Sequence, residues 1–298
     1  MQQSSINAQI PPEAKPYTIP ISQKEFGKRS ITEEYKILDD ITTDKQYISK
    51  LVRDDCYRNL NRYIDILPFE HSIVKLDEKK LSPDNYMNGN YLYNPLLSDQ
   101  KKSFILTQGP LDHTVNNFWR MVDVEGVSNV ISIVETNNLG LRCAKYWPEK
   151  KMKTSNYEIE TINHSKNSLF HKKEFNLTNL THKTVRKVNH YHIFNWIDFS
   201  TLNVDDMNGL LNLIDILYKE RSKNFSPIVV HCSAGVGRSG TFAAIFFAYE
   251  FWKFCEKQGI EFKISIFDLL LQMRGMRFGL VQTLQQYKFI YAVVRKFK

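Results

Sequence analysis

The chain has 298 residues, of which 42% are hydrophobic, so it is long enough to form one large domain with a complete core. No stretch reaches the roughly 18 apolar residues that a membrane span requires, and the N-terminal segment lacks the apolar core of a signal peptide. The four cysteines show neither a disulfide-framework spacing nor a C-x-x-C pair, which favours a reducing, cytoplasmic environment.

The net charge is +8 at pH 7, and basic residues are concentrated between Lys145 and Lys187. A positive field of this kind attracts acidic phosphopeptides, although an ordinary solvated surface produces the same pattern. No nucleic-acid-binding motif accompanies the charge, so we expect no nucleic-acid partner. We also expect the protein to be a monomer.

Residues 1–25 hold four of the ten prolines and show little apolar periodicity. Such a composition predicts a flexible N-terminal arm, because it offers few side chains that a core would retain. We therefore expect a single large domain at 26–298.

The segment HYHIFNWIDFS, from His190 to Ser200, begins with β-favouring residues that predict a strand up to Trp196. Asp198 then falls on the loop beyond the strand. Alternate residues of a strand share one face, so His190 and His192 are candidates for a metal site. No third ligand with suitable spacing is evident, and we therefore expect no metal.

Apolar residues at helical spacing predict three helices in the last third of the chain. The predicted helices are Asp206–Lys223, Ser239–Lys257 and Ile266–Arg274. Ser265 precedes the third helix and Asp268 follows three residues later, which is a capping-box pattern.

The segment VVHCSAGVGRSGTF, Val229–Phe242, combines the end of a strand, three glycines and the start of a helix. The apolar, β-branched run at 228–230 predicts a short buried strand, so Cys232 lies where the strand ends. The glycines permit tight turns that aim backbone N–H groups inward, and the helix start adds positive potential. Together these features predict an anion-binding loop shaped for phosphate.

Cys232 lies at the mouth of this loop, and Arg238 follows it six residues later. The positive field that binds phosphate also favours a thiolate, whose pKa falls from about 8.5 to roughly 3.5–7.5 in such surroundings. The planar guanidinium of Arg238 binds two phosphate oxygens at once. A buried structural cysteine is the weaker interpretation, because C-x-x-x-x-x-R with this glycine pattern is far more specific than a lone motif. The nucleotide-binding pattern G-x-x-x-x-G-K-[ST] is absent, so we do not expect ATP or GTP.

HCSAGVGRSG at His231–Gly240 resembles the signature loop of the protein tyrosine phosphatases, and the resemblance extends from about Phe26 to the C-terminus. It is closest to the phosphotyrosine-specific branch of the family. The resemblance implies an α/β fold in which a twisted mixed β-sheet is flanked by helices. It also implies hydrolysis of phosphotyrosine on proteins, without a metal or another cofactor.

The resemblance assigns roles within the signature loop. Cys232 is the expected nucleophile, and Arg238 is expected to bind the phosphoryl group together with the loop amides. These amides belong to Ser233, Ala234, Gly235, Val236 and Gly237. Ser239 is expected to stabilise the thiolate as a leaving group, and His231 to order the loop by hydrogen bonding.

NRYIDI, Asn61–Ile66, resembles the family loop that recognises phosphotyrosine. Tyr63 matches the aromatic wall of a deep pocket, and Asp65 matches the carboxylate that accepts hydrogen bonds from the substrate backbone. A phosphoserine is too short to reach Cys232 in such a pocket, so the resemblance implies specificity for phosphotyrosine.

Trp196-Ile197-Asp198 matches the family's Trp-Pro-Asp loop, in which the aspartate is the general acid, but here Ile197 replaces the proline. The resemblance therefore makes Asp198 the expected acid, and then the base. Because proline restricts φ, its loss is expected to change how the loop divides between open and closed states.

GLVQTLQQ, Gly279–Gln286, resembles the family segment that serves the second chemical step. Gln282 matches the residue that places the hydrolytic water, and Gln286 matches its helper. Glu135 and Arg142 fall near two further family positions, a glutamate that orients the signature arginine and a cation that helps the acid loop to close.

Two other functions remain open. A non-catalytic phosphotyrosine-binding protein would use the same loop to hold a partner, and Ile197 is its only sequence support. An RNA 5′-phosphatase on the same fold is the second, and the Tyr63 loop argues against it. The chain, a compact domain rich in Asn, Lys and Ile, is also similar to phosphatases carried by bracoviruses of parasitoid wasps. That resemblance implies action in the host-cell cytoplasm and modulation of host signalling.

Overall fold

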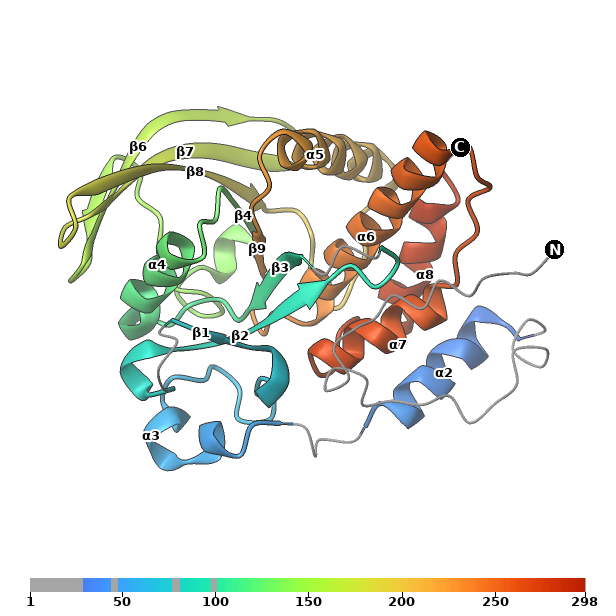
Figure 1. The fold of residues 1–298 in the computed structure, drawn as a ribbon, viewed down its shortest axis with the longest axis horizontal. Coiled ribbons are helices and arrows are strands. Elements are labelled where there is room, and N and C mark those ends of the chain that lie inside the picture. The colour runs from blue at the N-terminus through green and yellow to red at the C-terminus, as the bar shows by residue number, and fades with distance from the viewer. Residues whose placement is uncertain (1–28, 44–47, 77–80, 98–100, 298) are drawn as a thin grey trace.

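The computed structural model describes residues 29–43, 48–76, 81–97 and 101–297 (Figure 1). The N-terminal arm predicted at 1–25, and the predicted beginning of the domain at residue 26, lie outside these ranges. Within them, no helix combines the length and the apolar character that crossing a bilayer needs.

One mixed sheet runs through the described part of the chain, in the strand order β1-β2-β3-β9-β4-β8-β7-β6-β5. The strands are β1 (Ile73–Lys75), β2 (Tyr86–Tyr93), β3 (Lys102–Thr107), β4 (Asn129–Ile133), β5 (Lys151–Lys153), β6 (Tyr157–Lys166), β7 (Phe170–Asn179), β8 (Thr184–Ile193) and β9 (Ile228–His231). Strands β3, β9, β4 and β8 pair in parallel, and the outer neighbours pair antiparallel. The predicted α/β fold with a twisted mixed sheet flanked by helices is confirmed.

Helices cover both faces of this sheet. They are α2 (Ile31–Ile41), α3 (Asp55–Arg58), α4 (Val115–Val124), α5 (Val204–Lys223), α6 (Gly237–Gln258), α7 (Ile266–Met276) and α8 (Leu284–Val294). Helices α5 to α8 lie on one face and α4 lies on the other (Figure 1). Strand β3 serves both faces by alternation, since Phe104 and Leu106 join the core with α6 while Ile105 joins the core with α4.

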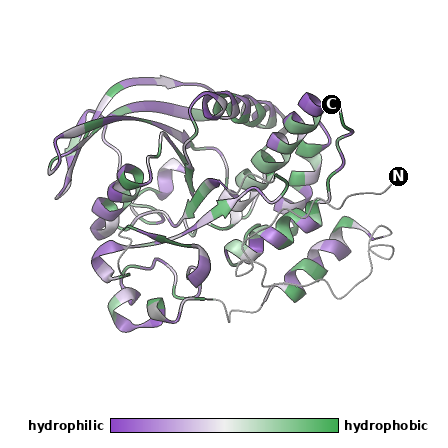
Figure 2. Cartoon of the chain, viewed as in Figure 1, coloured by the Kyte–Doolittle hydropathy of each residue, from purple (hydrophilic) through white to green (hydrophobic). Residues whose placement is uncertain are grey.

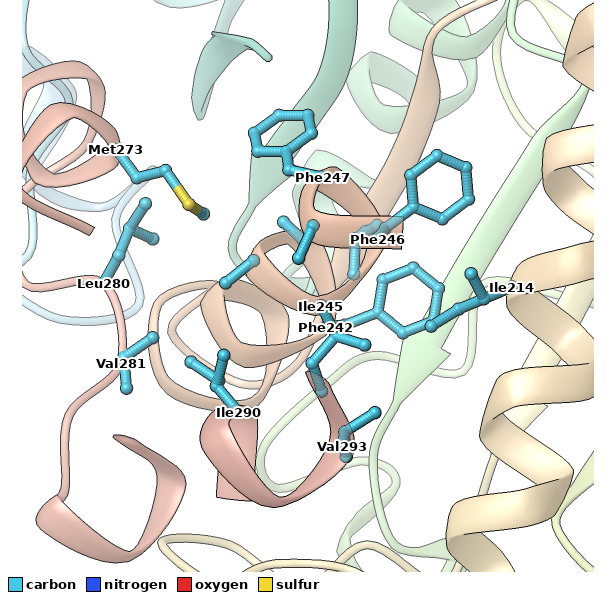
Figure 3. Packing of buried hydrophobic residues seen from close by; sticks show 14 of the residues in the cluster. Ile214, Phe242, Ile245, Phe246, Phe247, Met273, Leu280, Val281, Ile290 and Val293 are labelled. Carbon is cyan, nitrogen blue, oxygen red and sulfur yellow. The ribbon is translucent and has the colours of Figure 1, made fainter. Parts of the chain in front are cut away.

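Helix α6 is buried over most of its length, which fixes the position of the loop that precedes it. Figure 3 shows Phe242 and Phe246 of α6 in the core that also holds Ile214 of α5 and Ile290 and Val293 of α8. Figure 2 shows hydrophobic colour along α6 and mostly hydrophilic colour along the outer strands β6 and β7. Burying each such side chain contributes about 1.5–3 kcal/mol, so the start of α6 is firmly held.

The predicted elements near the signature loop are present, with ends shifted by two residues or fewer. The strand expected at 228–230 is β9, and the three predicted helices are α5, α6 and α7. Ser265 caps α7, because its hydroxyl oxygen accepts a hydrogen bond of 3.1 Å from the backbone N–H of Asp268.

The strand predicted to reach Trp196 is wrong at its end, because β8 stops at Ile193. Ile193 pairs with Ile133, the last residue of β4, and with Phe170, the first residue of β7, so neither neighbouring strand continues past it. Trp196 instead leaves the sheet and is buried in the core formed with α5 to α8. Asp198 lies on the loop beyond the strand, as predicted.

Candidate active site

Cys232 directly follows strand β9 and is 3% exposed within the signature loop, His231–Gly240. The backbone N–H of Gly235 donates to the Cys232 sulfur at 3.3 Å. The other predicted amide donors lie in the same buried loop: Ser233, Ala234, Val236 and Gly237. Helix α6 begins at Gly237, within this segment, so the loop meets the positive end of a helix dipole.

Gly235 is the position where the loop requires glycine. Its φ is +71°, and a Cβ placed on it would lie 2.0 Å from the carbonyl oxygen of Thr107. We expect Gly235→Ala to displace the loop, at a cost of about 1–3 kcal/mol in unfolding free energy. The displacement should also lower the hydrolysis rate of a phosphotyrosyl peptide by roughly 10²-fold.

Thermal unfolding and a rate assay measure these two effects. Gly259→Ala is the matched control, because Gly259 also has a positive φ, of +66°, but no atom would lie within 4 Å of an added Cβ. If Gly235→Ala were no more harmful than Gly259→Ala, the close approach to Thr107 would not be what fixes the loop.

Arg238 presents part of its guanidinium group without a hydrogen-bond partner. Its Nη1 donates to Glu135 Oε2 at 2.6 Å and to the carbonyl oxygen of Trp196 at 2.8 Å. Its Nε has no hydrogen-bond partner, and its Nη2 lies 3.2 Å from Asp198 Oδ1 without making a hydrogen bond. The side chain is fully buried, and buried unpaired donors are costly, so the free edge of the guanidinium is suited to an anion.

The pKa of the Cys232 thiol is lowered. Burial acts to raise the pKa, but the charge of Arg238 and hydrogen bonds from the side chain and backbone of Ser239 outweigh it. The Ser239 hydroxyl is buried and has no partner other than the sulfur, so nothing competes for its proton. A thiolate at this position is therefore accessible at a lower pH than for a free cysteine.

We expect iodoacetate to alkylate Cys232 with a midpoint at a lower pH than an ordinary cysteine, because its pKa is lowered. Since the thiolate fraction rises with pH, removing a group that lowers the pKa must move the midpoint upward. Ser239→Ala should therefore raise the alkylation midpoint. Peptide mass mapping after timed alkylation at each pH measures it.

Ser226→Ala is the matched control, because Ser226 is also a buried serine without a hydroxyl partner and precedes β9. An alkylation midpoint that stayed unchanged in Ser239→Ala, or moved downward, would contradict the assigned role of that hydroxyl.

Asp198 lies beside Arg238 of the signature loop and is held by three groups. Its Oδ2 accepts a hydrogen bond of 2.5 Å from Arg142 Nη1. Its backbone N–H donates to Glu135 Oε1 at 3.1 Å, and its Oδ1 lies near Arg238. Glu135 therefore links the loop carrying Asp198 to the signature arginine, and Arg142 draws the carboxylate inward.

Ile197 stands where the family has proline, and the loop still forms a closed turn. The Ile197 carbonyl oxygen accepts hydrogen bonds from the Ser200 backbone N–H at 3.2 Å and from the Ser200 hydroxyl at 2.7 Å. Trp196 Nε1 donates to the carbonyl oxygen of Ser200 at 3.0 Å. The Ile197 side chain itself is 64% exposed, so these polar contacts, not packing of the isoleucine, hold the turn.

Tyr63 contacts the signature loop directly, whereas Asp65 lines a cavity to which that loop does not contribute. The Tyr63 hydroxyl lies 2.8 Å from Ser233 Oγ, and Ser233 Oγ donates to the carbonyl oxygen of Arg142 at 3.0 Å. Asp65 is exposed beside a cavity of about 440 Å³, to which the 72% exposed Ile64 also contributes. A peptide held at Asp65 would lie along this cavity.

Gln282 and Gln286 meet the start of α6. The backbone N–H of Gln282 donates to Gln286 Oε1 at 2.9 Å, and Gln286 is fully buried with Nε2 unpaired. A Cβ on Gly237 would lie 2.6 Å from Gln282 Oε1, so this side chain lies against the loop. The Val281 N–H donates to the Val236 carbonyl oxygen at 3.1 Å, which attaches the segment to the signature loop.

Sequence reasoning missed Arg277, which supports the signature loop from behind. Its Nε donates to the carbonyl oxygen of Gly235 at 2.9 Å, and its Nη2 donates to the carbonyl oxygen of Ala234 at 3.0 Å. The side chain is 1% exposed, and burial lowers its pKa to about 10. These two hydrogen bonds hold the carbonyl groups of Ala234 and Gly235 on the side of the loop away from Cys232. The loop N–H groups are thereby left facing the sulfur.

His231 is a loop-ordering residue in this structure. Its Nδ1 lies 3.0 Å from the carbonyl oxygen of Cys232, and its Nε2 lies 2.7 Å from the Tyr146 hydroxyl. Burial lowers the pKa of His231 to about 4, so the ring is neutral at pH 7. His190 lies on the other side of the same hydroxyl, at 2.9 Å.

The two histidines considered as metal ligands are engaged in other contacts. His190 Nε2 faces the Tyr146 hydroxyl, and His192 Nε2 lies 2.7 Å from the carbonyl oxygen of Val134. Across the described ranges, no group of three or more His, Cys, Asp or Glu side chains is arranged to hold a metal ion.

The family model described as Protein-tyrosine phosphatase matches residues 57–296, and the chain belongs to that family. The Homo sapiens tyrosine-protein phosphatase non-receptor type 2 is 32% identical over 246 residues, covering 80% of this chain and 55% of that protein. The Gallus gallus receptor-type tyrosine-protein phosphatase eta is 32% identical over 237 residues, covering 78% of this chain and 16% of that protein. The chain thus spans less than two thirds of each relative.

Solved structures show the same fold. The catalytic domain of human protein tyrosine phosphatase non-receptor type 18 matches with a TM-score of 0.78 at 26% identity, covering 90% of this chain and 96% of that chain. The structure of PTPN18 in complex with HER2-pY1196 phosphopeptides also matches with a TM-score of 0.78 at 26% identity, covering 90% of this chain and 92% of that chain.

Proposed function

We propose that the chain hydrolyses phosphotyrosine on proteins through a cysteinyl-phosphate intermediate. The observation that carries the proposal is the juxtaposition of three groups. The charge of Arg238 lowers the pKa of the Cys232 thiol, part of the Arg238 guanidinium has no hydrogen-bond partner, and Asp198 Oδ1 lies 3.2 Å from Arg238 Nη2. Membership of the protein-tyrosine phosphatase family supports it, as does the binding of phosphopeptides by a structural relative.

In the first step the Cys232 thiolate attacks phosphorus. An S–P bond forms, the P–O bond to tyrosine breaks, and the phenolate oxygen takes the proton of the Asp198 carboxyl group. Arg238 and the loop amides stabilise the charge that develops on the phosphoryl oxygens. Glu135 contributes by holding both Arg238 and the backbone of Asp198 in place.

In the second step water attacks the phosphocysteine. The Asp198 carboxylate takes the proton of the water, the S–P bond breaks, and inorganic phosphate leaves. Gln282 lies against the loop where that water must approach, and Gln286 fixes the Gln282 backbone. Ser239 stabilises the departing thiolate by the same hydrogen bonds that lower its pKa. Neither step requires a metal or another cofactor.

Tyr63 sets the depth of the proposed pocket and therefore its choice of phosphoamino acid. Its hydroxyl contacts Ser233 within the signature loop, so the ring forms a wall beside Cys232. A phosphotyrosine ring extends far enough along this wall for phosphorus to meet the sulfur, whereas a phosphoserine ends short of it. Asp65 accepts hydrogen bonds from the peptide backbone outside the pocket.

Phosphate release from paired peptides of identical sequence, one with phosphotyrosine and one with phosphoserine, tests this function. We expect turnover of the first and at least 10²-fold slower turnover of the second, because roughly 2.7 kcal/mol of transition-state stabilisation is lost when phosphorus and sulfur do not meet. Equal rates would contradict a deep pocket, and no turnover of either would contradict the enzyme.

A non-catalytic protein that holds phosphotyrosine is the second candidate, and Ile197 is the observation that favours it. The proline replacement falls on the loop that carries the acid. If the wild-type chain binds a phosphotyrosyl peptide but releases no phosphate, this candidate is correct and the hydrolytic proposal fails. The turn closed by Ser200 argues for the enzyme, because it holds Asp198 over Arg238 without proline.

The proposed setting is the cytoplasm of a host cell, where a monomeric viral phosphatase would remove phosphate from signalling proteins. The setting rests on the composition of the chain, a compact domain rich in Asn, Lys and Ile, and on the free thiol of Cys232, which requires reducing conditions. Imaging of the tagged protein in insect blood cells tests the proposal. Cytoplasmic fluorescence with reduced phosphotyrosine would support it, and unchanged phosphotyrosine would contradict it.

A further inference from the structure

A second cavity, of about 400 Å³, lies away from Cys232 against the outer strands β6, β7 and β8. Its other wall comes from residues of the segment at 136–149, which begins directly after Glu135. Four lysines and four histidines line it, against a single glutamate, Glu149. The mechanism proposed above uses none of these side chains.

The lysines of this cavity are only partly compensated. Lys172 pairs with Glu174 at 2.8 Å, and Lys173 pairs with Glu149 at 2.7 Å. Lys145 and Lys166 have no carboxylate within ion-pair distance in the part of the chain that the structure describes. Two ammonium groups therefore remain available to an anionic ligand.

Hydrogen-bond donors accompany this charge. His171 Nε2 is enclosed and has no partner, which is costly for a buried polar group and favours a ligand that satisfies it. Burial and then the charges of Lys166 and Lys173 lower the pKa of His171, so the ring is neutral and the potential around it is positive. The ring of His192 is held by its contact with the Val134 carbonyl oxygen. His192 is buried and forms part of the base of the cavity.

We propose that this cavity is a binding site for a small phosphate-bearing anion. The ammonium groups of Lys145 and Lys166 bind the phosphate oxygens, and the His171 ring donates its N–H to one of them. The positive charge of the lysines repels a metal cation at this place. The histidines therefore act as hydrogen-bond donors and not as metal ligands. The volume suits a compound the size of pyrophosphate or a sugar phosphate.

Histidine-ring NMR of the full chain, titrated with sodium pyrophosphate, tests the site, because His171 and His192 report on the cavity and His231 reports on the signature loop. We expect saturable shifts of the His171 and His192 signals. In the double variant Lys145→Gln/Lys166→Gln the affinity should fall about tenfold or more, since two charge-assisted hydrogen bonds are lost.

The control is Lys223→Gln/Lys257→Gln, which removes the same charge from exposed positions on α5 and α6 outside the cavity. Pyrophosphate that shifts only His231, or that is weakened equally by both double variants, would overturn the site. A titration with citrate distinguishes phosphate from carboxylate anions, and shifts with citrate alone would overturn the ligand class.

Discussion

Replacing Cys232 by serine should abolish phosphate release from a phosphotyrosyl peptide while leaving peptide binding intact. The serine hydroxyl does not ionise at neutral pH, so the attacking group is lost and the rate should fall by roughly 10⁴-fold or more. Arg238 keeps its unpaired guanidinium edge in the variant, so the anion is still bound. Phosphate release and peptide titration calorimetry measure the two effects separately.

Cys56→Ser is the control for this experiment, because Cys56 is the exposed free thiol on α3 and touches none of the proposed catalytic groups. It should retain the wild-type rate. Substantial turnover by Cys232→Ser, or equal losses in the two variants, would contradict the assignment of Cys232 as nucleophile.

Asp198→Ala should lower kcat by about 10²–10⁴-fold, which is the usual contribution of a positioned general acid. The phenolate leaving group then departs without a proton, and the second step lacks its base. KM should change less than kcat, because Arg238 and the loop amides still bind the phosphoryl group. Steady-state kinetics with a phosphotyrosyl peptide measure both parameters.

The matched control is Asp205→Ala, since Asp205 is an exposed aspartate near the beginning of α5 and makes no contact with the signature loop. A small loss in Asp198→Ala, comparable to that of Asp205→Ala, would mean that the loop carrying Ile197 does not deliver its acid. Substrates whose leaving groups have a lower pKa provide a second readout. Such groups depart without a proton more easily, so these substrates should restore the rate of Asp198→Ala most strongly.

The signature loop could be predicted because its requirements are local. The β-branched run before Cys232, the three glycines and the helical spacing after Arg238 are all contiguous, and each has one physical interpretation. The structure places Cys232 between β9 and α6 as that pattern requires. The start of α6 was less accurate, because Gly237 belongs to the helix although glycine is a poor helix former.

The end of β8 could not be predicted, because it depends on neighbouring strands. The β-favouring residues continue to Trp196, but the pairing partners of Ile193 in β4 and β7 end there. Local propensity thus favoured a longer strand than the sheet supports.

Arg277 is the clearest residue that the sequence concealed. An arginine in a run of mixed residues is usually exposed, and nothing in its neighbourhood distinguishes a buried one. Its partners, the carbonyl groups of Ala234 and Gly235 and the side chains of Asn88 and Asn90, are distant in sequence. The link from Glu135 to the Asp198 amide was likewise visible only in three dimensions.

The most direct test is to detect phosphate on Cys232 itself. The wild-type chain, quenched in acid during turnover of a phosphotyrosyl peptide, should yield a Cys232-containing peptide heavier by one phosphoryl group. Gln282→Ala should increase that species, because water is placed less well for the second step. Phosphate release with no phosphocysteine in either protein, and with the rate unchanged in Cys232→Ser, would contradict the account.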